Sequence, residues 1–173
     1  MHKFIASFIC AALLIASSPA YTADYIDRHV PDAQTVGQGR MSVLFWDVYD
    51  VTLYAPAGNL KQGQPFALAL SYLRDLDGQK IADRSVEEIR GQGFTDEVKL
   101  ATWHTQMRKI FPDVSAGMTL TGVHTSAGAT IFYQNAKKIG QINDPLFSKA
   151  FFDIWLSEKT SAPALRRSLL GLM

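Results

Sequence analysis

The sequence has little cysteine and no excess of either charge. Cys10 is the one cysteine among 173 residues, which carry 17 basic and 16 acidic side chains. A single cysteine excludes an internal disulfide, and Cys10 lies in an apolar leader that we expect to be removed, which would leave no thiolate chemistry. Nucleic-acid binding normally needs a clear basic excess, so we expect no nucleic-acid partner.

The first residues have the pattern of a secretory signal. Lys3 makes the start basic, residues 4–16 are almost continuously apolar, and small residues then suit cleavage after Ala20 or Ala23. The apolar core is too short to anchor the chain in a bilayer. We therefore expect a signal peptide over residues 1–23 and export of the protein, into the periplasm if the host is Gram-negative.

The remaining residues, 24–173, are enough for one domain with a sizeable core. No later apolar stretch is long enough to span a membrane, so we expect no integral span after the signal is removed. Periodicity and turn residues predict a series of helices and strands. In order, these are one long strand or a bent pair over 41–55, a strand over 66–73, a helix over 79–91, a helix capped by Thr95 and stopped by Pro112, a meander over 117–142, a helix from Asp144-Pro145, and a helix over 163–171. This order predicts an α+β fold, with helices on one side of a mainly antiparallel sheet.

Motifs for common catalytic and metal chemistry are missing. His29, His104 and His124 show no paired spacing, and no cysteine assists them, so we expect no metal site and no cofactor. The serines lack a nucleophile-elbow motif, and no strand-then-helix pattern follows the glycines before Arg40. We therefore predict no catalytic residue.

The stretch GRMSVLFWDVYDVTLY, residues 39–54, is the most informative one. Strand alternation places Asp47, Tyr49 and Val51 on one side and Asp50 on the other. Two interpretations of Arg40 remain open. It is an ordinary rim residue, or its guanidinium projects into a pocket and holds an anionic headgroup, with a tyrosine hydroxyl as a second donor.

Three segments carry a resemblance to a known family. These are GQGRMSVLFWDVYDVTLYA, LALSYLRDLDGQKIADRSVEEI and FSKAFFDIWLSEKTSAPALRRSLLG. Together they resemble bacterial secreted members of the chalcone isomerase-like family, over roughly Val36 to Gly171. The resemblance implies an open-faced β-sandwich, in which helices cover a large antiparallel sheet and leave an apolar cleft between the layers. Plant chalcone isomerases close a flavanone ring in that cleft, a related branch binds fatty acids through an arginine and a tyrosine, and other members are non-catalytic.

Matched by motif, Arg40 is similar to the family's cleft arginine. Tyr49 stands where the isomerases have a threonine and the fatty-acid-binding branch has a tyrosine. On the following helix, Ile81 replaces the isomerases' tyrosine, Arg84 their lysine and Glu88 their asparagine. The resemblance therefore implies ligand binding by Arg40 and Tyr49 without the remaining catalytic groups.

We accordingly expect an exported, non-catalytic protein that binds a small apolar or amphipathic carboxylate, such as a fatty acid, in an apolar cleft. Two alternatives remain. One is an intramolecular lyase or isomerase of chalcone isomerase type. The other is a structural or interaction protein whose cleft is filled by its own aromatic side chains.

The leader generates a first prediction. Mass spectrometry of the protein isolated from its native host is expected to show a chain that begins near Tyr21 or Asp24, because the small residues before both positions suit a signal peptidase. Recovery of the full-length chain from the cytoplasm would contradict it.

Overall fold

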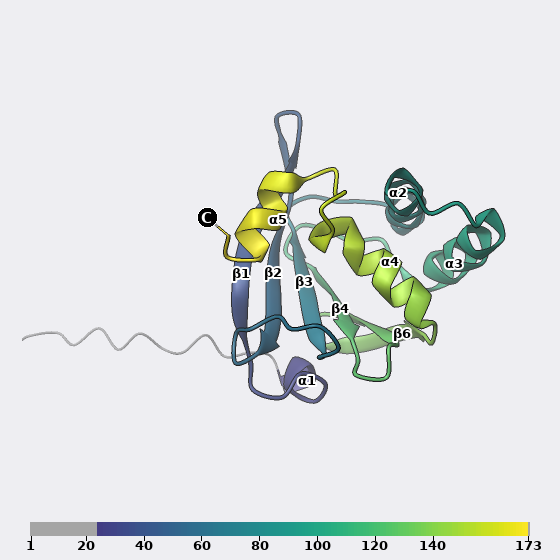
Figure 1. Ribbon diagram of the computed structural model, residues 1–173. Coiled ribbons are helices and arrows are strands. Elements are labelled where there is room, and N and C mark those ends of the chain that lie inside the picture. The colour runs from purple at the N-terminus through teal and green to yellow at the C-terminus, as the bar shows by residue number, and fades with distance from the viewer. Residues whose placement is uncertain (1–23, 173) are drawn as a thin grey trace, which may run out of the picture.

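A six-stranded antiparallel sheet forms the centre of the computed structural model, which describes residues 24–172 (Figure 1). The predicted signal peptide therefore lies outside the described residues. Each strand pairs with the next along the chain, so the sheet is a simple meander. Its strands are β1 (Ala33–Val43), β2 (Trp46–Pro56), β3 (Phe66–Tyr72), β4 (Thr119–His124), β5 (Thr130–Gln134) and β6 (Lys137–Ile142).

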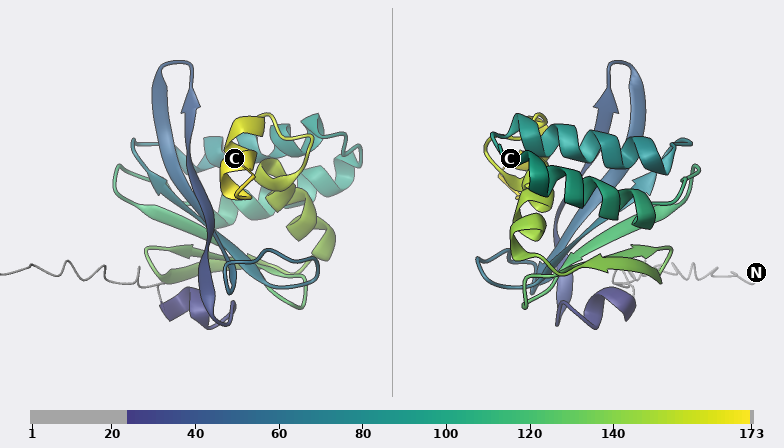
Figure 2. Two further views of the ribbon diagram at one scale, coloured as in Figure 1. Left: turned by 60° about the vertical axis from the view of Figure 1, so that its left-hand side comes forward. Right: turned by 90° about the vertical axis from the view of Figure 1, so that its right-hand side faces the viewer.

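Four helices cover one face of this sheet (Figures 1 and 2). α2 (Gly78–Gly91) and α3 (Glu97–Ile110) form the connection from β3 to β4, and α4 (Pro145–Leu156) and α5 (Pro163–Leu169) follow β6. A short helix, α1 (Asp24–Asp27), lies on the opposite face. The predicted α+β class, with helices layered on one side of an antiparallel sheet, is confirmed.

Aspartates begin the three longer helices. Asp77 accepts hydrogen bonds from two backbone N–H groups at the start of α2, and Asp144 does the same for α4, where Pro145 is the first residue as predicted. α3 is capped by Asp96, which accepts from the Lys99 N–H, and the prediction of Thr95 as the cap was wrong by one residue. An aspartate side chain accepts hydrogen bonds from the free N–H groups of the first turn. Its negative charge is also attracted to the positive end of the helix dipole, which favours aspartate over threonine as a cap.

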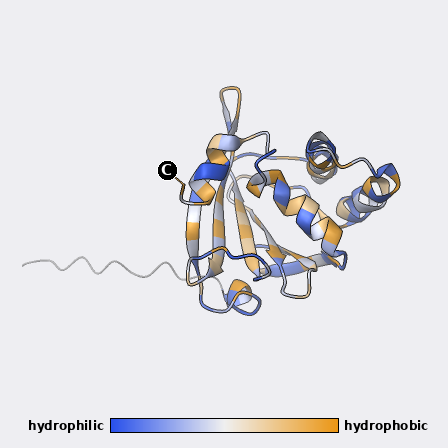
Figure 3. Ribbon diagram, viewed as in Figure 1, coloured by the Kyte–Doolittle hydropathy of each residue, from blue (hydrophilic) through white to orange (hydrophobic). Residues whose placement is uncertain are grey.

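The core between sheet and helices is rich in aromatic rings. Phe147, Phe151 and Trp155 recur at helical spacing along the sheet-facing side of α4, and they are buried. The apolar stripe of α4 is visible as orange segments in Figure 3. The indole N–H of Trp103 on α3 donates to Asp144, 3.0 Å away, which ties α3 to the start of α4.

The first part of the sheet is a pair of strands, one of the two predicted alternatives, but it begins earlier than predicted. Residues 41–55 belong to two strands, β1 and β2, joined by the two-residue turn Leu44-Phe45, and residues 33–40 of β1 were not predicted as a strand. Hairpin turns of this length favour glycine, asparagine or aspartate. A turn made of leucine and phenylalanine therefore carries no sequence signal.

A β-bulge near this turn changes the predicted faces of β2. Met41 pairs with Tyr49, but the next residue, Ser42, pairs with Asp47, so Val48 is the extra residue. The prediction that Asp47 shares a face with Tyr49 was wrong, because an extra residue reverses the alternation beyond it. Asp47 lies instead on the side of Asp50.

The last helix closes tightly onto the edge strand. α5 packs on β1 where the strand carries Gly37 and Gly39. A Cβ atom at Gly37 would overlap the carbonyl oxygens of Ser168 and Leu169, and one at Gly39 would meet the side chain of Leu165. Only residues without a side chain allow the helix backbone to come this close.

This approach predicts the effect of two glycine substitutions. Gly37→Ala is expected to lower the free energy of unfolding by about 1–3 kcal/mol, because its methyl group meets rigid backbone. Gly91→Ala, at the open end of α2 with no atom near its added methyl group, is expected to leave stability unchanged or raise it by up to about 1 kcal/mol. Urea denaturation measures both, and equal effects would contradict the packing of α5 on β1.

Candidate ligand cavity

A cavity of about 1040 Å³ lies between the sheet and the helix layer. Ordinary ligand pockets measure roughly 300–1,000 Å³ and have mainly apolar walls with few polar groups. The apolar wall is supplied from the sheet by Leu68, Leu70, Leu120 and Phe132, and from the helix layer by Ile81, Phe151, Phe152, Ile154, Trp155 and Leu165. The cavity is therefore large enough for a small-molecule ligand and suited to an apolar one.

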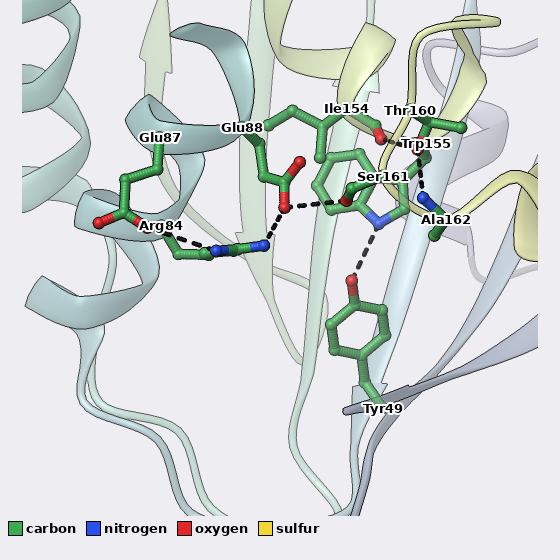
Figure 4. Close-up of polar contacts among 9 residues, drawn as sticks. All are labelled: Tyr49, Arg84, Glu87, Glu88, Ile154, Trp155, Thr160, Ser161 and Ala162. Atoms are coloured by element: carbon green, nitrogen blue, oxygen red, sulfur yellow. Dashed lines mark hydrogen bonds and ion pairs between the residues drawn. The ribbon is translucent and has the colours of Figure 1, made fainter. Parts of the chain in front are cut away.

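Tyr49 provides one polar group inside this wall. Its hydroxyl oxygen accepts a hydrogen bond from the indole N–H of Trp155 on α4, at 3.0 Å (Figure 4). An indole only donates, so the hydroxyl proton of Tyr49 remains available to a ligand. Burial raises the pKa of Tyr49 to about 12, which keeps the phenol protonated at neutral pH.

Tyr72 provides a second hydroxyl, which the sequence analysis missed. It pairs with Tyr49 across β2 and β3, and the two rings meet edge to face with centroids 5.7 Å apart. Tyr72 is 3% exposed, and its hydroxyl has no hydrogen-bond partner among the described residues. Burial also raises the pKa of Tyr72. The strand register, which brings it beside Tyr49, was the missing signal.

Arg40 has a different environment from Tyr49. It pairs with Asp50 across β1 and β2, on the face of the sheet opposite Tyr49. Its Nε donates to Asp50 at 2.6 Å and its Nη1 to Asp47 at 2.9 Å. The guanidinium is half exposed, and Arg40 is one of the residues that border the cavity.

The two carboxylates that hold Arg40 are ionised at neutral pH. A hydrogen bond from Ser42, and then those from Arg40, lower the pKa of Asp47, and the hydrogen bonds from Arg40 lower the pKa of Asp50. Arg40 therefore braces the base of the β1–β2 hairpin. Its predicted role as a ligand-binding residue stays a prediction, and so does that of Tyr49.

A charged group on α2 forms the polar edge of the cavity. Glu88 pairs with Arg84 and accepts a hydrogen bond from Ser161 at 3.0 Å (Figure 4). The Glu88 side chain is 13% exposed, whereas that of Arg84 is 66% exposed. Ser161 precedes α5, so this contact joins α2 to the segment between α4 and α5. Lys80 also borders the cavity from α2.

The three α2 positions singled out by the resemblance, Ile81, Arg84 and Glu88, all line the cavity. Ile81 offers no hydroxyl there, and Glu88 adds a negative charge that Arg84 neutralises. The arrangement can bind an apolar body and donate two hydrogen bonds from phenols. Within residues 24–172, no helix is long and apolar enough to cross a bilayer.

Each of the three described histidines contacts a nearby side chain. His29 bonds to the Tyr133 hydroxyl at 2.7 Å, and His124 bonds to the Ser148 hydroxyl at 2.7 Å. His104 contacts Asp83 at 2.6 Å. In the described part of the chain, no three potential metal-binding side chains of histidine, cysteine, aspartate or glutamate come together.

The raised pKa of Tyr49 predicts how stability depends on pH. The folded protein holds this proton to about pH 12, whereas an unfolded tyrosine releases it near pH 10. The stabilising contribution is therefore full below pH 10 and is lost as the pH rises to about 12, a loss of about 3 kcal/mol. Urea denaturation at stepped pH is expected to show a smaller loss over this range in Tyr49→Phe than in the wild type. Parallel curves would contradict a buried, protonated Tyr49.

Comparisons with known proteins identify the family. A model of the family described as "Chalcone isomerase-like" matches residues 33–171. The fold resembles the crystal structure of a fatty-acid binding protein from Arabidopsis thaliana, with a TM-score of 0.65 and 13% sequence identity, over 81% of this chain and 87% of that chain. A search of curated proteins finds no significant match. The family match spans most of the chain and the fold agrees with it: this protein belongs to the chalcone isomerase-like family.

Proposed function

We propose that this protein binds a small amphipathic carboxylate, such as a fatty acid, without transforming it. The observation that carries the proposal is the cavity itself, which combines apolar walls with two buried phenols, one of them lacking a protein partner. The structural neighbour from Arabidopsis thaliana is a fatty-acid binding protein by its title, which supports the same ligand class.

The apolar wall accounts for the body of such a ligand. Each methylene group removed from water contributes about 0.8 kcal/mol. An alkyl chain has no polar atoms that need hydrogen-bond partners. The rings of Phe132, Phe151 and Phe152, which line the cavity, have no hydrogen-bonding groups and therefore suit such a chain. A chain of ten or more carbons therefore gains enough free energy from burial to offset the loss of its own freedom.

The two phenols account for the headgroup. A carboxylate accepts hydrogen bonds at both oxygens, and bonds to a charged acceptor are stronger than bonds to a neutral one. Tyr49 has a free hydroxyl proton after accepting from Trp155, and the Tyr72 hydroxyl is unpartnered. A carboxylate between them would accept a hydrogen bond from each hydroxyl.

The cation predicted for the headgroup is Arg40. Its guanidinium is held by Asp47 and Asp50, so contact with a carboxylate in the cavity requires at least one of these pairs to open. Lys80 also borders the cavity and offers positive charge without such a change, whereas Arg84 is held by Glu87 and Glu88. Comparing the affinities for a carboxylate and for the matching alcohol shows whether a given cation contacts the charged headgroup.

Two other functions receive less support. A closed core without a ligand is at odds with a cavity of about 1040 Å³. Cyclisation of a chalcone needs donors at the ketone oxygen and a held phenolate. Ile81 supplies no donor at the position where the isomerases have a tyrosine, and Glu88 brings a negative charge to the cavity edge. Export of the protein is also a proposal, because the predicted signal peptide lies outside the described residues.

The proposal predicts that one substitution changes binding but not stability. Tyr72→Phe is expected to leave the free energy of unfolding nearly unchanged, because the hydroxyl faces the cavity and makes no hydrogen bond within the described residues. The same variant is expected to bind dodecanoate about 10-fold or more weakly, since a hydrogen bond to a charged group contributes about 1.5–3 kcal/mol. Tyr49→Phe should weaken dodecanoate binding similarly. Isothermal titration calorimetry and urea denaturation measure the two quantities.

The matched control is Tyr54→Phe, because Tyr54 packs with the cluster on the other face of the sheet. Its affinity for dodecanoate should equal that of the wild type. Arg40→Ala is expected to weaken dodecanoate more than dodecanol, and equal losses for the two would limit Arg40 to bracing the hairpin. Failure of the wild type to bind dodecanoate would refute the proposed ligand class.

A further inference from the structure

The tip of the β1–β2 hairpin is an exposed apolar protrusion. It consists of Val43, Leu44, Phe45 and Trp46, whose residues are 57%, 87%, 99% and 60% exposed. Figures 1 and 2 show the tip extending beyond the rest of the sheet and beyond the helix layer. Single exposed apolar residues are common on soluble proteins, but four in succession on one projection indicate an interaction surface.

Backbone strain singles out the same tip. Leu44 has a φ of 57°, in the left-handed region that glycine and asparagine adopt more easily. A leucine there is unfavourable twice, because its backbone is strained and its side chain is in water. Strained residues persist in sites where they serve a function, and this one places an apolar side chain at the outermost point of the fold.

The charges below the tip largely cancel. Arg40 pairs with Asp47 and Asp50, and the guanidinium of Arg74 lies 4.6 Å from the centre of the Trp46 ring. Two positive and two negative side chains thus form a collar under the apolar tip. Attraction to a charged partner therefore contributes little, and burial of the four apolar side chains must supply the binding energy.

We propose that this hairpin tip, residues 43–46, docks the protein onto the surface of a lipid bilayer. A stable protein interface buries about 800 Å² on each partner on a surface of matching shape, which a narrow two-residue turn does not offer. A bilayer needs no matching shape, and it accommodates leucine and phenylalanine in its acyl region with tryptophan at the headgroup level. The neutral collar fits zwitterionic headgroups.

The position of the tip relative to the cavity adds a second argument. Val43 and Leu44 belong both to the tip and to the residues that line the cavity. Docking would therefore place one edge of the cavity at the bilayer surface, where amphipathic molecules partition. The docking itself does not require the proposed carboxylate, and it is measured without one.

Flotation with large unilamellar vesicles of phosphatidylcholine tests the proposal. The wild-type domain is expected to float with the vesicles, and the emission of Trp46 is expected to shift to shorter wavelength and to be quenched by brominated acyl chains. Trp103 and Trp155 are buried, so Trp46→Phe identifies the contribution of Trp46 to the emission.

The variant L44N/F45S should bind vesicles at least 10-fold more weakly. Its thermal stability should be unchanged or higher, because asparagine suits the left-handed position. Val98→Ser, which changes an apolar residue on α3 that is 79% exposed, should bind like the wild type.

Several outcomes would overturn the inference. They are failure of the wild type to float, equal binding by L44N/F45S, and binding that requires anionic lipid and disappears in high salt. A wild-type dimer that L44N/F45S converts to a monomer would instead make the tip an interface between copies of the chain. All of these can be obtained whether or not the protein binds dodecanoate, so they are independent of the proposed function.

Discussion

The close approach of α5 to β1 is the constraint on which the cavity depends. Because Gly37 and Gly39 lack side chains, the backbone of α5 comes down onto the edge strand and closes one side of the space between helices and sheet. At the other side, Ile110 at the end of α3 would contact any side chain placed at Gly140 on β6. The layer is thus held down at both edges, while larger side chains keep it apart in the middle. This separation leaves the cavity open.

One β-bulge decides which side chains of the β1–β2 hairpin point to each face of the sheet. The bulge at Val48 keeps Tyr49 toward the cavity and turns Asp47 to the opposite side, where it joins Asp50 in holding Arg40. The ion pairs stiffen a hairpin that projects into solvent, and the phenol remains in an apolar environment. Because the charges are neutralised on the outer face, the inner face can stay apolar.

The polar groups of the cavity differ in how completely they are satisfied. Glu88 is held by Arg84 and Ser161, and the Tyr49 oxygen is held by Trp155. The Tyr72 hydroxyl makes no hydrogen bond within the described residues, so it and the proton of the Tyr49 hydroxyl are the donors that this cavity keeps for another acceptor.

The sequence by itself determined the fold class, the order of most elements and the candidate residues Arg40 and Tyr49. Helical periodicity and the helix start at Asp144-Pro145 are local signals, and local backbone chemistry decides them. Only the tertiary structure decided the first hairpin, the pairing of Tyr72 with Tyr49 and the partners of Arg40. The turn Leu44-Phe45 carries no turn signal, and one bulged residue reverses which faces its neighbours share. Register and burial come from contacts between residues distant in sequence, so a pattern read along one strand does not contain them.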